Sequence, residues 1–484
     1  MITRGPGYFM RALDLYKGKR NLGALKCSLL ALMREPFRKA PWLLLMKSFT
    51  RLVLPAPFVN ALKIARRPPD LAADYIHFIR LRRRLAGATR DIGTPGGVRR
   101  EDRGGNILFI VRDMGLGGVS RVNLDIIRGM GEGPFRFHIA ATSPANNVWR
   151  GQFEACCRTV IVPEWEMKDF GVWGRYFCDI VRRLDIQTAV VSNSYVGYHV
   201  LPRLKEQFPR LKTLDILHME GMWGTTETSK WTIPYLDKRI VISNSLKDFM
   251  TKEYENFGVA REYAERLETI YNGIDLSRYR PEDRGKGRFK ARFGIPPDAK
   301  IISFIGRFSL QKLPCLFVDI ANAILERNPG PGLKFVMAGD GEDMGKVKEA
   351  IAKYGMTDRF ILPGMLGEDE VALLLADTYL LLVASLNEGI PLVIFEAMLM
   401  KVPVISTDVG AIHEIVEDKR NGRLISRGGD LIGSYAGAVF DFLSGRLDYD
   451  AMAVRAGDTI AQRYSRERMA RAYAASFTRL RSSQ

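Results

Sequence analysis

From residue 106 onward, short apolar runs of strand length alternate with segments of helix length. Such alternation predicts parallel sheets with crossover helices, because parallel neighbours cannot be joined by a tight hairpin. The first series of predicted strands comprises residues 107–111, 137–141, 159–162, 188–192, 214–218 and 239–243. The second series comprises residues 301–305, 334–338, 360–362, 379–384 and 402–406. We therefore predict an α/β protein with two doubly wound, Rossmann-like parallel-sheet domains.

The junction between the two domains is expected in the polar, charged and glycine-containing segment 281–290. We expect a first domain over residues 106–283 and a second over 284–464, with the active site in the cleft that they face. A last helix over 465–484 is expected to pack back towards the first domain. Residues 91–105, with five glycines and a proline, are typical of a linker.

Residues 1–105 carry most of the positive charge. They contain 22 Lys and Arg against 7 Asp and Glu, a net charge of +15 out of +18 for the 484-residue chain. Apolar side chains recur between them at helical spacing, as at Leu22, Leu25 and Leu29. Basic amphipathic helices favour an anionic membrane surface, and the alternatives are a helical subdomain packed on the main body or RNA binding. We expect a basic, mostly helical extension that binds an anionic membrane surface, and no nucleic-acid partner.

The chain shows no cleavable signal peptide and no apolar run that is long enough to span a membrane and free of charge and proline. Its five cysteines are odd in number and lack metal-ligand spacing, which fits a reducing cytosol. We therefore expect a cytoplasmic protein that is peripherally associated with the inner face of the cell membrane.

Two glutamates, Glu388 and Glu396, stand eight residues apart. A predicted strand ends just before Glu388, and a helix can start at about Pro391, so Glu388 is expected on a strand-end loop and Glu396 inside the helix. Backbone N–H groups at Gly389 and at the helix start would attract phosphate, and the carboxylates could bind sugar or ribose hydroxyls. Apolar neighbours bury the helix around Glu396, and a carboxylate there is rarely tolerated without a partner. This argues against an ordinary solvated acid and predicts a sugar nucleotide as the ligand.

Another predicted strand, 301–305, leads into Gly306, Arg307 and, five residues later, Lys312. Two cations at one strand end can hold a diphosphate, because arginine offers a planar fork of donors and lysine a compact charge. Taken alone, such a pair is more often two surface charges.

The first predicted strand is followed by a glycine loop that includes Gly117 and Gly118. Glycines let the backbone approach a ligand closely, with a helix N-terminus behind them. The loop looks like a dinucleotide fingerprint, but Ser120 occupies the third glycine position and the second strand ends without the acid expected to hold a ribose. A nicotinamide dehydrogenase is therefore disfavoured.

A D-x-D pair, Asp448 and Asp450, falls in a predicted helical tail rather than at a strand end. We interpret it as a chance match to a metal-binding signature. The five histidines show no ligand spacing either. We expect no metal and no cofactor, with a UDP- or GDP-linked sugar as the substrate.

The order of the motifs resembles the retaining glycosyltransferases of family 4, which have the GT-B fold. After the glycine loop the series is "LHME" at 217–220, "VISNS" at 241–245, "IYNGIDLSRYRP" at 270–281, "FIGRFSLQK" at 304–312, "MAGDGED" at 337–343, "ILPGMLG" at 361–367, "EGIPLVIFEAM" at 388–398 and "VPVISTDVGAIHEIV" at 402–416. The resemblance covers about residues 106–480 and is strongest over 271–424. It does not reach the basic N-terminal extension.

The resemblance implies a role for each residue that matches a family motif. Arg307 and Lys312 would bind the diphosphate, and Glu396 would accept the ribose hydroxyls. Glu388 and His218 would contact the transferred sugar as catalytic residues, although a structural role is the alternative for His218. Further donor contacts are expected at Gly117, Gly118, Gly389, Ile390, Pro391, Leu392 and Val393, and beside the base at Pro363, Gly364 and Met365. Many members have Gly-Phe-Gly where this chain has Ile390-Pro391-Leu392, which leaves the donor sugar open.

The implied reaction is metal-independent transfer of a sugar, with retention of configuration, to a glycan or lipid-linked acceptor in cell-surface polysaccharide or lipopolysaccharide biosynthesis. Cations at the diphosphate would stabilise the departing nucleotide. Retention needs either a nucleophilic carboxylate or same-face attack. We favour same-face attack, in which the leaving phosphate accepts the acceptor's proton. The rivals are a non-catalytic GT-B scaffold and a sugar-phosphate synthase or phosphorylase of the same fold.

Overall fold

The structure is a computed structural model, and it describes residues 105–131, 133–220, 231–256, 258–327 and 332–482. The basic extension and the linker predicted over residues 1–105 therefore lie outside the described residues, apart from Gly105. Both sheets belong to one compact unit of the chain, which contains the described residues 105–166 and 173–482.

The first sheet has seven strands in the order β3-β2-β1-β4-β5-β6-β7. These are β1 (Asn106–Val111), β2 (Arg136–Ala141), β3 (Thr159–Ile161), β4 (Ile186–Ser192), β5 (Lys212–Leu217), β6 (Lys238–Val241) and β7 (Leu267–Thr269). Every pair of neighbours is parallel. The strand order reverses between β1 and β4, and such a reversal opens a crevice at the carboxyl ends of the two strands.

The second sheet has six strands in the order β10-β9-β8-β11-β12-β13, again all parallel. These are β8 (Lys300–Ile305), β9 (Leu333–Ala338), β10 (Phe360–Gly364), β11 (Thr378–Val383), β12 (Val404–Thr407) and β13 (Arg423–Ile425). Its order reverses between β8 and β11. The prediction of two doubly wound parallel sheets is thus confirmed.

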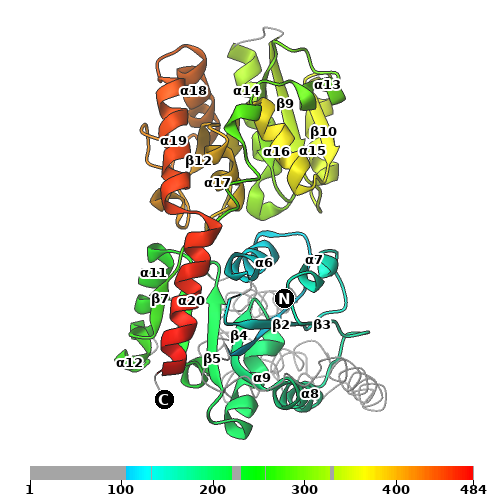
Figure 1. The fold of residues 1–484 in the computed structure, drawn as a ribbon. Coiled ribbons are helices and arrows are strands. Elements are labelled where there is room, and N and C mark those ends of the chain that lie inside the picture. Colours follow the sequence, from blue (N-terminus) through cyan, green and yellow to red (C-terminus); the bar gives the residue numbers. More distant parts are fainter. Residues whose placement is uncertain (1–104, 132, 221–230, 257, 328–331, 483–484) are drawn as a thin grey trace, which may run out of the picture. The chain divides into compact units, whose positions relative to one another are not determined.

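Helices join the strands of both sheets, as Figure 1 shows. Between β1 and β7 they are α6 (Gly118–Met130), α7 (Arg150–Glu154), α8 (Phe170–Arg183), α9 (Tyr195–Gln207), α11 (Asn244–Asn256) and α12 (Arg261–Ala264). After β7 they are α13 (Arg288–Arg292), α14 (Pro314–Arg327), α15 (Met344–Lys353), α16 (Glu368–Asp377), α17 (Leu392–Leu399), α18 (Leu431–Leu443), α19 (Tyr449–Arg463) and α20 (Arg466–Ser482). Short 3-10 turns include η3 (Ile233–Tyr235), η4 (Pro281–Asp283), η5 (Leu310–Lys312) and η6 (Ile412–Glu414).

The central strands are buried on both faces. In β1, Leu108, Phe109 and Ile110 are all 0% exposed, so successive side chains on opposite faces of the sheet are equally covered. A continuous apolar run is typical of a parallel strand with helices on both sides. This burial explains why the central strands could be predicted from the sequence.

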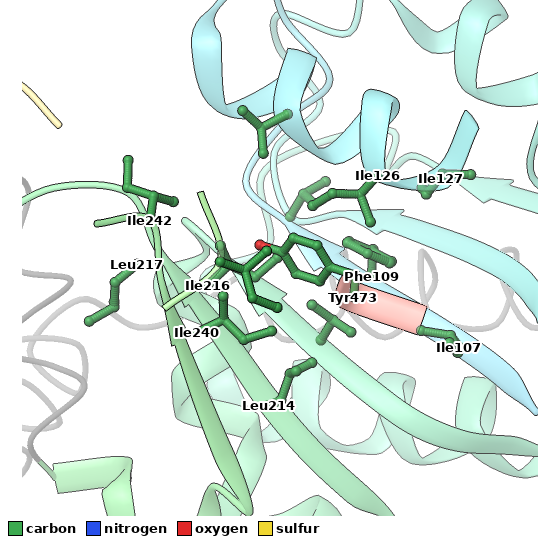
Figure 2. Close-up of a cluster of buried hydrophobic side chains, with 14 of the residues drawn as sticks. Ile107, Phe109, Ile126, Ile127, Leu214, Ile216, Leu217, Ile240, Ile242 and Tyr473 are labelled. Atoms are coloured by element: carbon green, nitrogen blue, oxygen red, sulfur yellow. The ribbon is translucent and has the colours of Figure 1, made fainter. Parts of the chain in front are cut away.

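Helix α20 follows α19 in the sequence but packs on the first sheet, where Figure 1 draws it in red. Its Tyr473 and Phe477 are fully buried in the same core cluster as Phe109 of β1 and Ile126 of α6. Figure 2 shows the ring of Tyr473 among Phe109 and Ile216. Burying an aromatic ring contributes about 1.5 to 3 kcal/mol, so α20 is an integral part of this core.

Asp448 of the D-x-D pair has a local structural role. It is the N-cap residue of α19, and its Oδ1 accepts a hydrogen bond of 3.0 Å from the backbone N–H of Ala451. Such a cap stabilises a helix by about 1 kcal/mol, which accounts for an aspartate at this position.

No helix among the described residues is both long and apolar enough to cross a membrane.

Candidate functional site

A cavity of about 800 Å³ is lined by residues that follow the strands on either side of both reversal points. Gly117 and Asn193 follow β1 and β4 of the first sheet, while Arg307 and Glu388 follow β8 and β11 of the second. The carboxyl ends of strands at a reversal are where open α/β sheets bind ligands. The volume lies within the usual range for small-molecule sites, about 300 to 1,000 Å³.

Lys312 and Glu388 form an ion pair at the second reversal point. The Nζ atom of Lys312 lies 2.5 Å from Oε1 of Glu388, although the two residues are 76 positions apart in the sequence. The Glu388 side chain is only 6% exposed, so its charge depends on this partner. The ammonium group of lysine has three donors, so Lys312 can hold Glu388 and still donate to a phosphate.

The loops that carry this pair are joined by two further hydrogen bonds from Gln311. Its side-chain amide donates to the carbonyl of Asn387 at 2.8 Å, and its own carbonyl accepts from the N–H of Leu386 at 2.8 Å. Both bonds lie next to the ion pair, so they hold the loop of Lys312 against the loop of Glu388. Gln311 lines the cavity but was not among the predicted site residues.

Gly389 must be a glycine for steric reasons. A Cβ atom there would lie 2.0 Å from the carbonyl oxygen of His218, closer than any real contact. A second close approach involves Glu388, the residue before Gly389. A Cβ on Gly410, which has φ +56°, would lie 1.8 Å from the carbonyl oxygen of Glu388. Two glycines thus let three loop backbones pack against one another around Glu388.

Glu396 lies in the second turn of α17 and lines the cavity. Its Oε1 accepts a hydrogen bond of 2.6 Å from the hydroxyl of Tyr279. Burial raises the pKa of the Glu396 carboxyl, whereas the Tyr279 hydrogen bond and the nearby Arg121 guanidinium lower it. The partner that a buried carboxylate requires is therefore Tyr279, a residue that the sequence prediction did not include.

His218 follows β5 and is partly exposed at the cavity, with its Nε2 atom 3.0 Å from the hydroxyl of Ser192. The imidazole is otherwise enclosed by protein, and this desolvation lowers its pKa to about 4. At neutral pH the ring is uncharged. It can therefore accept a hydrogen bond from a ligand hydroxyl or donate one to it, but it does not supply a positive charge.

Gly117 and Gly118 stand at the start of α6, with Gly117 as the N-cap residue. A Cβ atom on either glycine would meet nothing within 4 Å, so packing inside the protein does not demand glycine at these positions. The empty space beside them is the cavity itself. A 13-residue helix thus presents its free N–H groups to the cavity, with room for an anion to approach the backbone.

Arg307 is exposed at the cavity and forms no ion pair with any residue that the structure describes. The cavity lining contains six cationic side chains, Arg112, Arg121, Arg128, Arg278, Arg307 and Lys312, against four carboxylates, Glu368, Asp369, Glu388 and Glu396. Three of these groups are joined, since the carboxylate of Glu368 forms ion pairs with both Arg121 and Arg278. The excess of positive charge and the free Arg307 suit an anionic ligand.

Most of the predicted site residues line this one cavity. They are Gly117, Gly118, His218, Arg307, Lys312, Glu388, Gly389, Ile390, Pro391, Leu392, Val393 and Glu396. Pro363, Gly364 and Met365 do not line it; β10 ends at Gly364, and the next residues, Leu366 and Gly367, line the cavity instead. Arg278 lines the cavity, and Tyr279 donates to Glu396, which lines it; both were missed as site residues although they belong to the "IYNGIDLSRYRP" motif.

Two doubly wound sheets whose reversal points meet one cavity define the GT-B class of protein. Solved structures agree on the fold. A glycosyltransferase from Rickettsia africae superposes with a TM-score of 0.65 at 14% identity, over 78% of this chain and 100% of that one. HepE from Anabaena, solved in complex with UDP and glucose, gives a TM-score of 0.64 at 18% identity over the same shares.

The sequence comparisons agree with this class. Residues 299–444, less than half of the chain, match the family model described as "Glycosyl transferases group 1". Among curated relatives, D-inositol 3-phosphate glycosyltransferase of Nocardia farcinica is 32% identical over 208 residues, which cover 42% of this chain and 44% of that protein. The chain thus spans less than half the length of this relative. The resemblance to GT-B glycosyltransferases that the motifs predicted is confirmed.

Proposed function

We propose that the protein is a retaining glycosyltransferase that transfers a sugar from a UDP- or GDP-linked donor to a glycan or lipid-linked acceptor. The observation that carries the proposal is the Lys312–Glu388 pair, which sits at a strand reversal in the same cavity as the open helix start at Gly117. A cation, free backbone N–H groups and a buried carboxylate are the groups that a diphosphate and its sugar need.

The leaving diphosphate would lie between the start of α6 and the two cations, Arg307 and Lys312. As the bond from the sugar's anomeric carbon to the phosphate oxygen breaks, negative charge grows on the phosphate, and these donors stabilise it. The acceptor hydroxyl then attacks the anomeric carbon from the same face. Its proton passes to the departing phosphate oxygen, so no protein base is needed for this step.

Glu388 would stabilise the positive charge that develops on the sugar ring. Because its Oε1 is bound to Lys312 at 2.5 Å, this carboxylate is held in place by an ion pair. That arrangement favours an electrostatic role over a covalent one. His218, neutral at physiological pH, would position a sugar hydroxyl, and Glu396 would accept the ribose hydroxyls.

The test is a donor screen with product analysis. UDP- and GDP-linked sugars should raise the melting temperature of the protein, since a ligand at 100 times its Kd adds about 2.7 kcal/mol of stability. HepE was crystallised with UDP-glucose, so UDP donors come first. NMR of the product should show the anomeric configuration of the donor, and EDTA should leave the rate unchanged. Binding without transfer to any acceptor would favour a scaffold, and a sugar-phosphate product would favour a synthase.

The proposed setting is the assembly of cell-surface polysaccharide or lipopolysaccharide at the inner face of the membrane. It is supported by the concentration of +15 of the +18 net charge in residues 1–105. A basic segment of this kind would bring the enzyme to anionic lipids and so to a lipid-linked acceptor.

A further inference from the structure

We propose that Tyr279 is a positioning residue for the donor: its hydroxyl keeps the Glu396 carboxylate ionised and oriented to receive the ribose hydroxyls. The inference rests on the proposed function and adds a residue to the proposed donor-binding set. Tyr279 contacts Glu396 and is not among the residues that line the cavity, so we assign it no catalytic role.

The side chain of Tyr279 has little conformational freedom. Tyr279 is 1% exposed and belongs to the same core cluster as Ile394, Phe395 and Met398 of α17. Its hydroxyl donates to Oε1 of Glu396 at 2.6 Å, across 117 positions of sequence. The ring is held by packing, so the hydroxyl is held as well. The hydrogen bond engages one carboxylate oxygen, and no bond to Oε2 from any described residue accompanies it, which leaves Oε2 available at the cavity.

Few other charges act on Glu396. Arg121 of α6 favours its ionised form, and Asp125, which is itself bound to Arg121 at 2.6 Å, disfavours it. Helices α16 and α19 contribute apolar residues such as Leu375 and Ile460 to the core cluster around α17. Burial raises the pKa of Glu396, and this rise is opposed mainly by the hydrogen bond from Tyr279 and by the charge of Arg121 at longer range.

The charge state of Glu396 matters for binding. An ionised carboxylate accepts hydrogen bonds from hydroxyl groups, whereas a protonated one loses part of that capacity. Burial raises the pKa of Glu396, so acidification protonates it at a higher pH than an exposed glutamate. The hydroxyl of Tyr279 counteracts this effect. Burial and the negative charge of Glu396 also raise the pKa of Tyr279 itself, so the phenol stays protonated and remains a donor.

The test compares Tyr279→Phe, which removes one oxygen atom, with Tyr473→Phe. Tyr473 is also fully buried, and its hydroxyl has no hydrogen-bond partner among the described residues. UDP affinity is measured by calorimetry between pH 5 and 8. In Tyr279→Phe the pH below which UDP affinity falls should rise by about one unit, because a hydrogen bond to a charged group is lost. Tyr473→Phe should follow the wild type.

A second measurement needs no ligand. A carboxyl whose pKa is raised by folding contributes stability below the pKa of the unfolded chain, about 4.3, and loses it as pH rises through the folded pKa. Tyr279→Phe raises that folded pKa further. The difference in melting temperature between Tyr279→Phe and the wild type should therefore widen from pH 4 to pH 7, while that of Tyr473→Phe stays constant.

The outcomes separate the two hypotheses. Wild-type protein that binds neither UDP nor GDP would overturn the proposed function and, with it, this role of Tyr279. Wild-type binding with an unshifted pH profile in Tyr279→Phe would overturn the inference alone. A pH-independent loss of stability equal in both variants would reduce Tyr279 to a packing residue and overturn it as well.

Discussion

At the scale of single residues, Arg307 and Lys312 differ in a way that mutation can reveal. Arg307 is exposed and free of ion pairs among the described residues, whereas Lys312 is bound to the buried Glu388. We expect Arg307→Ala and Lys312→Ala each to weaken UDP or GDP binding by about 1.5 to 3 kcal/mol in calorimetry, because each loses a charge-assisted contact. Only Lys312→Ala should also lower the melting temperature. Unchanged affinity in both variants would contradict the diphosphate assignment.

Glu388→Gln keeps the shape of the side chain and an oxygen that can still accept from Lys312, but removes the negative charge. If Glu388 acts on the reacting sugar, turnover should fall by roughly a hundredfold or more while nucleotide affinity changes little. Steady-state kinetics with a UDP-sugar and calorimetry with UDP separate the two effects. Near-normal turnover would assign Glu388 a structural role.

The sequence predicted where these residues stand in their own segments but not which of them meet. Glu388 and Lys312 were each placed at a strand end, but their pairing depends on β8 and β11 being neighbours in the sheet. Local sequence patterns do not determine the order of strands in a sheet. Tyr279 was missed because nothing local marks a buried tyrosine as the partner of a glutamate 117 positions away.

At the scale of secondary-structure elements, local apolar runs decided what could be predicted. The central strands form such runs and were found, whereas β7 (Leu267–Thr269) and β13 (Arg423–Ile425), with sequences LET and RLI, were missed. The edge strand β3 is equally short but was predicted, because its sequence TVI continues into Val162 as an apolar run. In β7 and β13 a charged residue interrupts or borders the apolar residues, so tertiary pairing rather than local sequence defines these two edge strands.

Gly118 and Gly389 both lie close to the start of a helix, but open space surrounds Gly118 and protein atoms surround Gly389. Substitution by alanine should therefore affect the two positions differently. Gly118→Ala adds a methyl group to open space in the first turn of α6, so stability should stay the same or rise by up to about 1 kcal/mol. UDP affinity should nevertheless fall, because the methyl group occupies the path of the phosphate.

Gly389→Ala is the matched contrast, since its Cβ atom would collide with the His218 carbonyl. It should lower the free energy of unfolding by about 1 to 3 kcal/mol, as overpacking does. Urea denaturation and calorimetry with UDP measure both quantities for each variant. Equal UDP affinity in Gly118→Ala and the wild type would contradict the proposed position of the donor phosphate at the start of α6.

At the scale of the whole molecule, charge is divided unevenly. The described domains are nearly neutral, because residues 1–105 hold +15 of the +18 net charge. That extension lies outside the described residues, so its role stays a prediction from sequence. Each basic residue close to an anionic leaflet contributes about 1 kcal/mol of attraction, and apolar stripes such as Leu22, Leu25 and Leu29 would add a part that salt does not screen.

We therefore expect the full-length protein to sediment with vesicles that contain anionic lipid, less so at high salt and not with neutral vesicles. Replacing Arg82, Arg83 and Arg84 by glutamate should weaken sedimentation at low salt, since it changes the charge by about six units at the membrane surface. A chain that starts at Asn106 should stay in the supernatant if it folds. Equal replacement of Lys346, Lys348 and Lys353 on α15 controls for total charge. If both triple variants lose sedimentation alike, net charge rather than the extension is responsible, and a packed helical subdomain is favoured.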